Sequence, residues 1–120
     1  MSNTNVIDQA TFDALLESVG GDETFLAELI DTFLDDSPQL FAAMRQSLGD
    51  GNAESFRRAA HSLKSNSANF GALALAALAK DLEALGKDNK LADATTTLAL
   101  AETEYKKVKD VLAQRRQAIG

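Results

Sequence analysis

Apolar residues recur every three or four positions through most of this chain, and each such run predicts an amphipathic α-helix. The best-defined run covers residues 53–70, which contain no glycine or proline. Its apolar or small positions are Phe56, Ala59, Ala60, Leu63, Ser67 and Phe70. At 3.6 residues per turn these positions fall within a stripe about 100° wide. This spacing predicts a helix with one buried face.

The same spacing predicts four further helices. A short helix starts near Asp8 or Thr11 and ends at Gly20–Gly21, and a second starts at Asp22. The second helix is expected to continue, with a kink, through Pro38, because the apolar phase is the same on both sides of the proline. It ends in a turn at residues 49–51.

The C-terminal half repeats this pattern twice. A helix is expected over residues 72–85, followed by a turn at residues 86–89. The last helix carries an apolar stripe from Leu91 to Leu112, and the tail at Arg115–Arg116 and Gly120 is expected to fray. The core is expected to contain five phenylalanines: Phe25, Phe33, Phe41, Phe56 and Phe70.

These elements predict an all-α fold, an antiparallel up-and-down four-helix bundle with a short N-terminal helix. Valine and isoleucine are scarce, which disfavours sheets, and the short glycine-containing turns favour antiparallel neighbours. We expect one monomeric domain over residues 1–120, with an ordered core over about residues 8–116.

Charge and composition narrow the possible functions. The net charge of −6 disfavours binding to nucleic acids or to an anionic membrane surface. The absence of cysteine excludes a disulfide framework and a thiolate metal site. The start of the chain lacks the features of a signal peptide, and no apolar run approaches about 18 residues. We therefore expect a cytoplasmic protein without direct membrane contact.

The candidate chemistry centres on His61, the only histidine. Its imidazole is the one side chain with an ordinary pKa near neutrality. It lies roughly 150° from the centre of the apolar stripe and should face solvent. Arg57, Arg58, Lys64 and Ser65 are its neighbours one turn away. A metal site is disfavoured because no second histidine or cysteine is present, and nothing resembles the nucleophile elbow of a hydrolase. From periodicity alone, an ordinary surface histidine remains the alternative.

The sequence around His61 resembles histidine-containing phosphotransfer (HPt) domains of phosphorelay signalling. The resemblance covers roughly residues 8–112, and one departure from the family pattern is Ser65, where many members have glycine. The matching features are Ala60-His61, Leu63-Lys64, the small residues Ser65, Ser67 and Ala68, Gly71, and the following helix with Leu73, Leu75, Leu78 and Leu82-Glu83.

This resemblance implies a phosphorelay intermediate. His61 would accept a phosphoryl group on Nε2 from a receiver-domain aspartate and pass it to another receiver aspartate. Lys64 would offset the added charge, and Gly71 would cap the helix as the family motif places it. The residues Arg57, Arg58, Ser65 and Ala68 are candidates for docking of the receiver.

The partners implied are response-regulator receiver domains, which could belong to a hybrid sensor kinase. The chain would be a carrier without kinase activity, metal or cofactor of its own, and magnesium would come from the receiver. Two alternatives stay open: a helical adaptor that is not phosphorylated, and a histidine-kinase dimerisation module, which would require a homodimeric two-helix hairpin.

Overall fold

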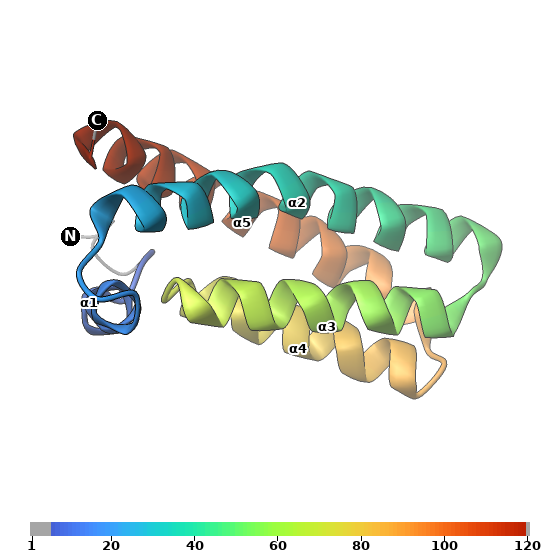
Figure 1. The fold of residues 1–120 in the computed structure, drawn as a ribbon. Helices are drawn as coiled ribbons and strands as arrows, with labels where there is room; N and C mark the ends of the chain where they lie inside the picture. The colour runs from blue at the N-terminus through green and yellow to red at the C-terminus, as the bar shows by residue number, and fades with distance from the viewer. Residues whose placement is uncertain (1–5, 120) are drawn as a thin grey trace.

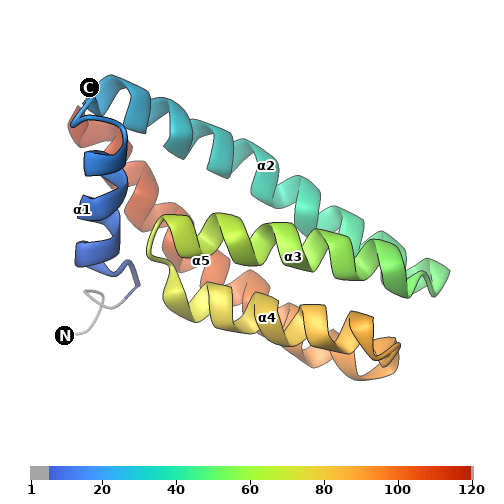
Figure 2. The ribbon, with the colours of Figure 1, turned by 60° about the horizontal axis from the view of Figure 1, so that its bottom comes forward.

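The computed structural model describes residues 6–119, and within this range it contains helices and no strand. Four long helices form an antiparallel bundle, and the short first helix lies across one end of it (Figures 1 and 2). Around the bundle α2 packs on α3, α3 on α4, α4 on α5, and α5 on α2. The elements are α1 (Gln9–Ser18), α2 (Glu23–Asp50), α3 (Ala53–Asn69), α4 (Leu73–Lys87), the 3₁₀ helix η2 (Leu91–Asp93) and α5 (Ala94–Ile119). The predicted fold class is confirmed.

Three helices begin at a polar side chain that caps them. Asp8, Asp22 and Asn52 each accept a hydrogen bond from the backbone N–H three residues later, at 3.0–3.1 Å. Such caps satisfy backbone donors that have no partner within the helix. The predicted starts of α1, α2 and α3 are therefore confirmed.

Helix α2 continues through Pro38, as the apolar phase predicts. A proline at this position removes one intrahelical hydrogen bond. The preceding residue, Ser37, is buried and donates its hydroxyl to the carbonyl of Phe33 at 2.7 Å. The inward face remains regular on both sides, with Phe33 and Phe41 buried. Packing of this face explains why the helix does not end at the proline.

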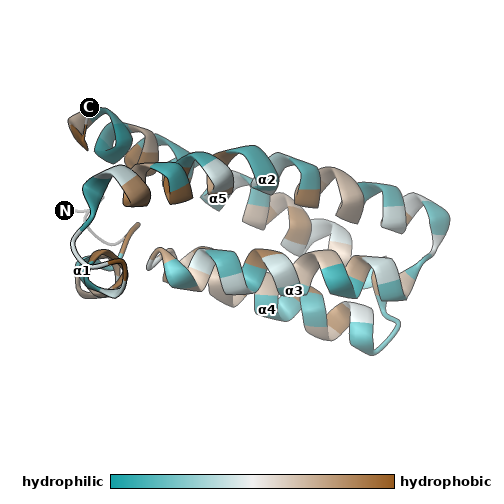
Figure 3. Cartoon of the chain, viewed as in Figure 1, coloured by the Kyte–Doolittle hydropathy of each residue, from teal (hydrophilic) through white to brown (hydrophobic). Residues whose placement is uncertain are grey.

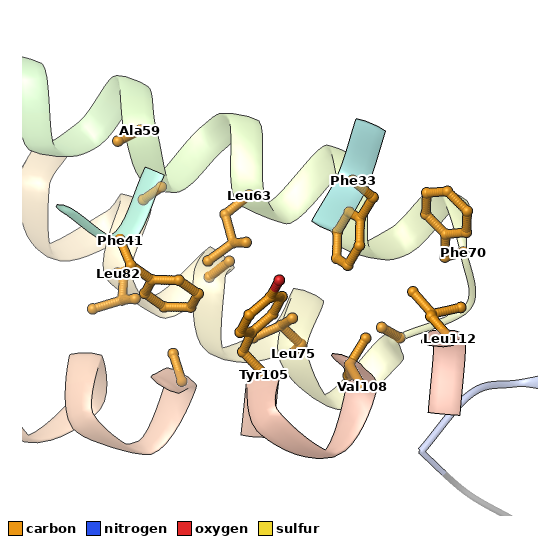
Figure 4. Close-up of a cluster of buried hydrophobic side chains, with 14 of the residues drawn as sticks. Phe33, Phe41, Ala59, Leu63, Phe70, Leu75, Leu82, Tyr105, Val108 and Leu112 are labelled. Atoms are coloured by element: carbon orange, nitrogen blue, oxygen red, sulfur yellow. The ribbon is translucent and has the colours of Figure 1, made fainter. Parts of the chain in front are cut away.

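The core lies between the four long helices, whose apolar faces point inward (Figures 3 and 4). Tyr105 of α5 packs between Phe33 and Phe41 of α2, with ring centroids 6.1 and 5.4 Å away. The predicted inward face of α3 is buried at all six positions. Phe25 is 45% exposed, so its predicted place in the core is wrong. It lies in the first turn of α2, where the adjacent Leu26 takes the inward position instead.

Two of the predicted turns begin too early, because glycines there belong to helices. Gly49 and Asp50 are still part of α2, and Gly51, with φ +67°, forms the turn. Gly86 and Lys87 belong to α4. A Cβ atom on Gly86 would lie 3.1 Å from the backbone of Arg57. The close packing of α3 against α4 therefore favours glycine here, because a larger residue would push the two helices apart by a few tenths of an ångström.

The C-terminal end of the chain does not fray as predicted, because α5 remains helical to Ile119. Two contacts hold it against the N-terminal helices. The Arg115 guanidinium lies 4.6 Å from the ring centroid of Phe12 on α1, and Arg116 pairs with Asp31 on α2 at 3.0 Å. Gly120 lies outside the described residues. Over the described range, no helix is both long enough and apolar enough to span a membrane.

Candidate functional site

His61 lies in the middle of α3, on the surface of the bundle. Its side chain is 55% exposed, while Ala60 and Leu63 beside it are fully buried. The exposure predicted from the helical angle is therefore confirmed. The buried neighbours fix the helix against the core, so the imidazole projects from a rigid element.

Glu83 of α4 holds one of the two ring nitrogens of His61. Its Oε2 atom is 2.7 Å from Nδ1 of the imidazole. An ionised carboxylate can only accept a hydrogen bond, so the neutral imidazole donates from Nδ1. The lone pair of the neutral ring is then on Nε2. The site therefore presents Nε2 as the nucleophilic nitrogen.

Lys64 binds the other oxygen of the same carboxylate. Its Nζ atom donates to Oε1 of Glu83 at 2.6 Å, and the glutamate side chain is only 19% exposed. The pKa of Glu83 is lowered below its ordinary value, mainly by the hydrogen bond from Lys64. Partial burial raises this pKa, and the hydrogen bond from His61 lowers it further. Glu83 is therefore ionised at neutral pH and links His61 to Lys64.

Within residues 6–119, Arg57 and Arg58 form no hydrogen bond with the imidazole, and both pair with Glu54, one turn earlier on α3. Arg57 makes two hydrogen bonds to the carboxylate, at 2.7 and 3.1 Å, and Arg58 makes one at 3.1 Å. These bonds lower the pKa of Glu54 to about 2. The two predicted docking cations thus form an ion-pair cluster at the N-terminal side of His61.

The small residues lie on the C-terminal side of His61. Ser65 is exposed, Ala68 is half-buried, and both side chains are small. Helix α3 ends at Asn69, and Gly71, two residues later, has φ +82° and donates its N–H to the carbonyl of Ala68 at 3.0 Å. This geometry is typical of a glycine C-cap, so the capping role predicted for Gly71 is confirmed.

Gly71 also contacts the residue that caps the start of α1. The backbone N–H of Asp8 donates to its carbonyl at 2.7 Å. A Cβ atom on Gly71 would lie 2.7 Å from the carbonyl oxygen of Asp8. The glycine is therefore required both by its left-handed backbone and by the close approach of the N-terminal segment.

Glu83 is the site residue to which the sequence analysis assigned no role. It lies twelve residues after Gly71, and His61 lies ten before it. Because α3 and α4 form an antiparallel hairpin about this turn, residues at similar distances from the glycine come opposite each other (Figure 2). That symmetry, applied to the predicted hairpin, would have brought Glu83 to His61.

Within residues 6–119 no group of three or more histidine and acidic side chains is placed to hold a metal ion. The side chains around His61 instead form a small network of one imidazole, one carboxylate and one ammonium group. This network can orient a nucleophilic nitrogen and place a cation beside it.

Comparison with known proteins gives a family match and two similar structures. A family model described as Hpt domain matches residues 28–118. The crystal structure of histidine-containing phosphotransfer protein B (HptB) from Pseudomonas aeruginosa PAO1 is 31% identical, with a TM-score of 0.87, and the match covers 94% of this chain and 96% of that one. No curated protein sequence matches the chain.

The second structure supports the fold alone. It is the HPT domain of a sensor hybrid histidine kinase from Shewanella, with 17% identity and a TM-score of 0.76 over 95% of this chain and 96% of that one. Both structures are similar to the described bundle over nearly its whole length.

Proposed function

Because this chain belongs to the family of Hpt domains, we propose that it is a phosphorelay intermediate. In this role His61 accepts a phosphoryl group from a receiver-domain aspartate and passes it to an aspartate of another receiver. The observation that carries the proposal is the bond between Glu83 and Nδ1 of His61, which leaves Nε2 on an exposed imidazole. A nucleophile that is oriented by an adjacent hydrogen-bonding group is a recurring arrangement in nucleophilic catalysis.

The transfer needs no proton to leave the site. The Nε2 lone pair attacks the phosphorus of the aspartyl phosphate, the N–P bond forms, and the O–P bond to the departing carboxylate breaks. The ring keeps its Nδ1 proton and becomes positively charged, and the Glu83 carboxylate at 2.7 Å stabilises this charge. Transfer to the next aspartate reverses these steps and returns the neutral ring.

Lys64 is proposed to stabilise the phosphorylated state. A phosphoryl group adds about −1.5 to −2 charge at neutral pH. Lys64 lies one turn after His61 and its side chain is 32% exposed. Its ammonium group has three N–H donors, so it can bind a phosphoryl oxygen while it remains close to Glu83.

Docking is proposed to occur over the exposed face of α3 around His61. Transfer requires the reacting atoms to approach within about 3–3.5 Å, and the small side chains of Ser65 and Ala68 allow a partner surface to come close. Arg57 and Arg58 border the same face. We propose that the receiver supplies the magnesium ion and that this chain hydrolyses no ATP, as a carrier whose catalysis arises in the complex.

The alternative of a kinase dimerisation module has less support. Such a module completes a four-helix core with helices from a second chain. Here α2, α3, α4 and α5 of one chain close a shared core by themselves. In the described part of the chain, the core is therefore closed without helices from a second hairpin.

The test uses a panel of receiver domains loaded with acetyl phosphate, each incubated with the wild-type chain and with the His61→Gln variant. We expect acid-labile, base-stable phosphate on the wild-type chain with at least one receiver, and none on the variant. Circular dichroism of the variant checks that its helices remain. Phosphate of the same stability on the variant, or none on the wild-type chain with any receiver, would contradict the proposed function and favour a helical adaptor.

A further inference from the structure

A groove lined by basic side chains runs between α3 and α4 beside His61. It encloses about 440 Å³ and is lined by Arg57, Lys64, Lys80, Glu83, Ala84 and Lys87. Four of these six residues are cationic and one is anionic, although the whole chain carries a net charge of −6. The groove is therefore positively charged, in contrast to the negative net charge of the whole chain.

Two of the four cations are compensated by carboxylates of the chain. Lys64 is bonded to Glu83, and Arg57 is bonded to Glu54. Lys80 and Lys87 are both exposed, and within residues 6–119 neither of them forms an ion pair. Their charges are available to an anionic group from outside the chain.

The two lysines flank the site along α4. Lys80 lies three residues before Glu83 and Lys87 four residues after it, on the same face of the helix. The Lys87 end lies beside Arg57, because the backbone of Arg57 approaches Gly86 closely. At a rise of 1.5 Å per residue the two lysines are separated by about 10 Å along the helix. They bracket the position at which Glu83 holds the imidazole.

We propose that this groove is a second part of the docking surface, in which Lys80 and Lys87 bind carboxylates on the receiver-domain face that surrounds the phosphorylated aspartate. The proposal rests on the proposed function and extends the docking surface from α3 onto α4. It makes Lys80 and Lys87 determinants of which receivers react with His61: receivers with acidic side chains beside the phosphorylation site are selected over those with neutral or basic ones.

Charge complementarity favours this occupant. The phosphoaspartate of the receiver is surrounded by the acidic groups that hold its magnesium ion. This chain is also acidic, so its net charge repels these groups. A cationic groove at the point of contact reverses the local field and accelerates encounter. The phosphoryl group on His61 is assigned to Lys64 and not to Lys80 or Lys87, because it is attached at Nε2 and Glu83 holds the opposite ring nitrogen toward α4.

The experiment measures kcat/KM for transfer to His61 from the acetyl-phosphate-loaded receiver that reacts fastest with the wild-type chain, over a range of salt concentrations. The test variant is Lys80→Gln/Lys87→Gln. The matched control is Lys106→Gln/Lys109→Gln, which removes the same charge from exposed lysines in the groove between α2 and α5, across the bundle. Phosphorylation by phosphoramidate, a small donor that needs no docking, is measured on all three proteins.

We expect the test variant to lose about tenfold in kcat/KM at low salt, with a weaker dependence on salt, because the lost charges act on encounter. The control should stay near the wild-type value, and the phosphoramidate rate should be equal in all three. Unchanged transfer in the test variant, an equal loss in the control, or a slower reaction with phosphoramidate would overturn the proposal. Failure of the wild-type chain to accept phosphate from any receiver would instead contradict the proposed function.

Discussion

Replacing Glu83 with alanine should slow phosphotransfer by about tenfold or more while the bundle stays folded. Among residues 6–119, Glu83 is the one that forms hydrogen bonds with both His61 and Lys64. The substitution removes the acceptor at Nδ1, so the imidazole loses its fixed tautomer and orientation. It also releases Lys64 from its place beside the ring.

The magnitude follows from the geometry of the bond. A hydrogen bond to a charged group contributes about 1.5–3 kcal/mol. The imidazole is 55% exposed and the glutamate 19% exposed, so water competes and the lower end of the range applies. About 1.4 kcal/mol corresponds to a factor of ten in rate. The effect on the free energy of unfolding should be smaller, about 0–1 kcal/mol, as for other partly exposed ion pairs.

The assay combines rapid-quench transfer from a phosphorylated receiver with ¹⁵N NMR of the imidazole. In the wild-type protein the spectrum should report a proton on Nδ1, and in Glu83→Ala a mixture of tautomers. The control is Glu102→Ala, which removes the carboxylate that pairs with Arg45 between α5 and α2. Equal transfer rates in Glu83→Ala and the wild-type chain, or an unchanged tautomer, would refute the positioning role of Glu83.

Three further predictions concern the same network and the helix end behind it. Lys64→Ala should still accept phosphate on His61, but with a transfer rate or phosphohistidine lifetime reduced about five- to thirtyfold, the equivalent of about 1–2 kcal/mol; unchanged kinetics would count against Lys64. The pKa of Glu83 is lowered by Lys64, so its contribution to stability is present above the ordinary pKa and is lost as pH falls through the lowered one; an NMR titration should give a midpoint below 4.5 that rises in Lys64→Ala. Gly71→Ala should lower the free energy of unfolding by about 2–5 kcal/mol, because the residue is left-handed and its Cβ would meet Asp8; a urea melt like that of the wild-type protein would contradict this.

The helices and the exposure of His61 could be predicted because they depend on local periodicity. The 3-4 spacing of apolar residues determines which face of α3 is buried, and His61 lies opposite that face. The same periodicity predicted that α2 continues through Pro38, as it does in the structure. Capping is equally local, since Asp8, Asp22 and Asn52 act on backbone groups three residues away.

The features that sequence reasoning missed depend on contacts between helices. Gly86 looks like a turn residue when considered alone, but it belongs to α4 and lies close to the backbone of Arg57. Arg115 was expected to lie in a frayed end, but its guanidinium packs on the ring of Phe12. Glu83 has a role only once α3 and α4 are paired. In each case the partner is distant in sequence, so it can be found only by pairing the predicted helices, as the symmetry about Gly71 does for Glu83.

The proposal that His61 carries the phosphoryl group on Nε2 is tested most directly by the NMR spectrum of the phosphorylated protein. The chain is labelled with ¹⁵N, phosphorylated by a receiver, and examined for coupling between ³¹P and the ring nitrogens of its single histidine. We predict coupling to Nε2, with the proton retained on Nδ1 beside Glu83. Coupling to Nδ1, or phosphorus that is not bonded to His61, would contradict the account.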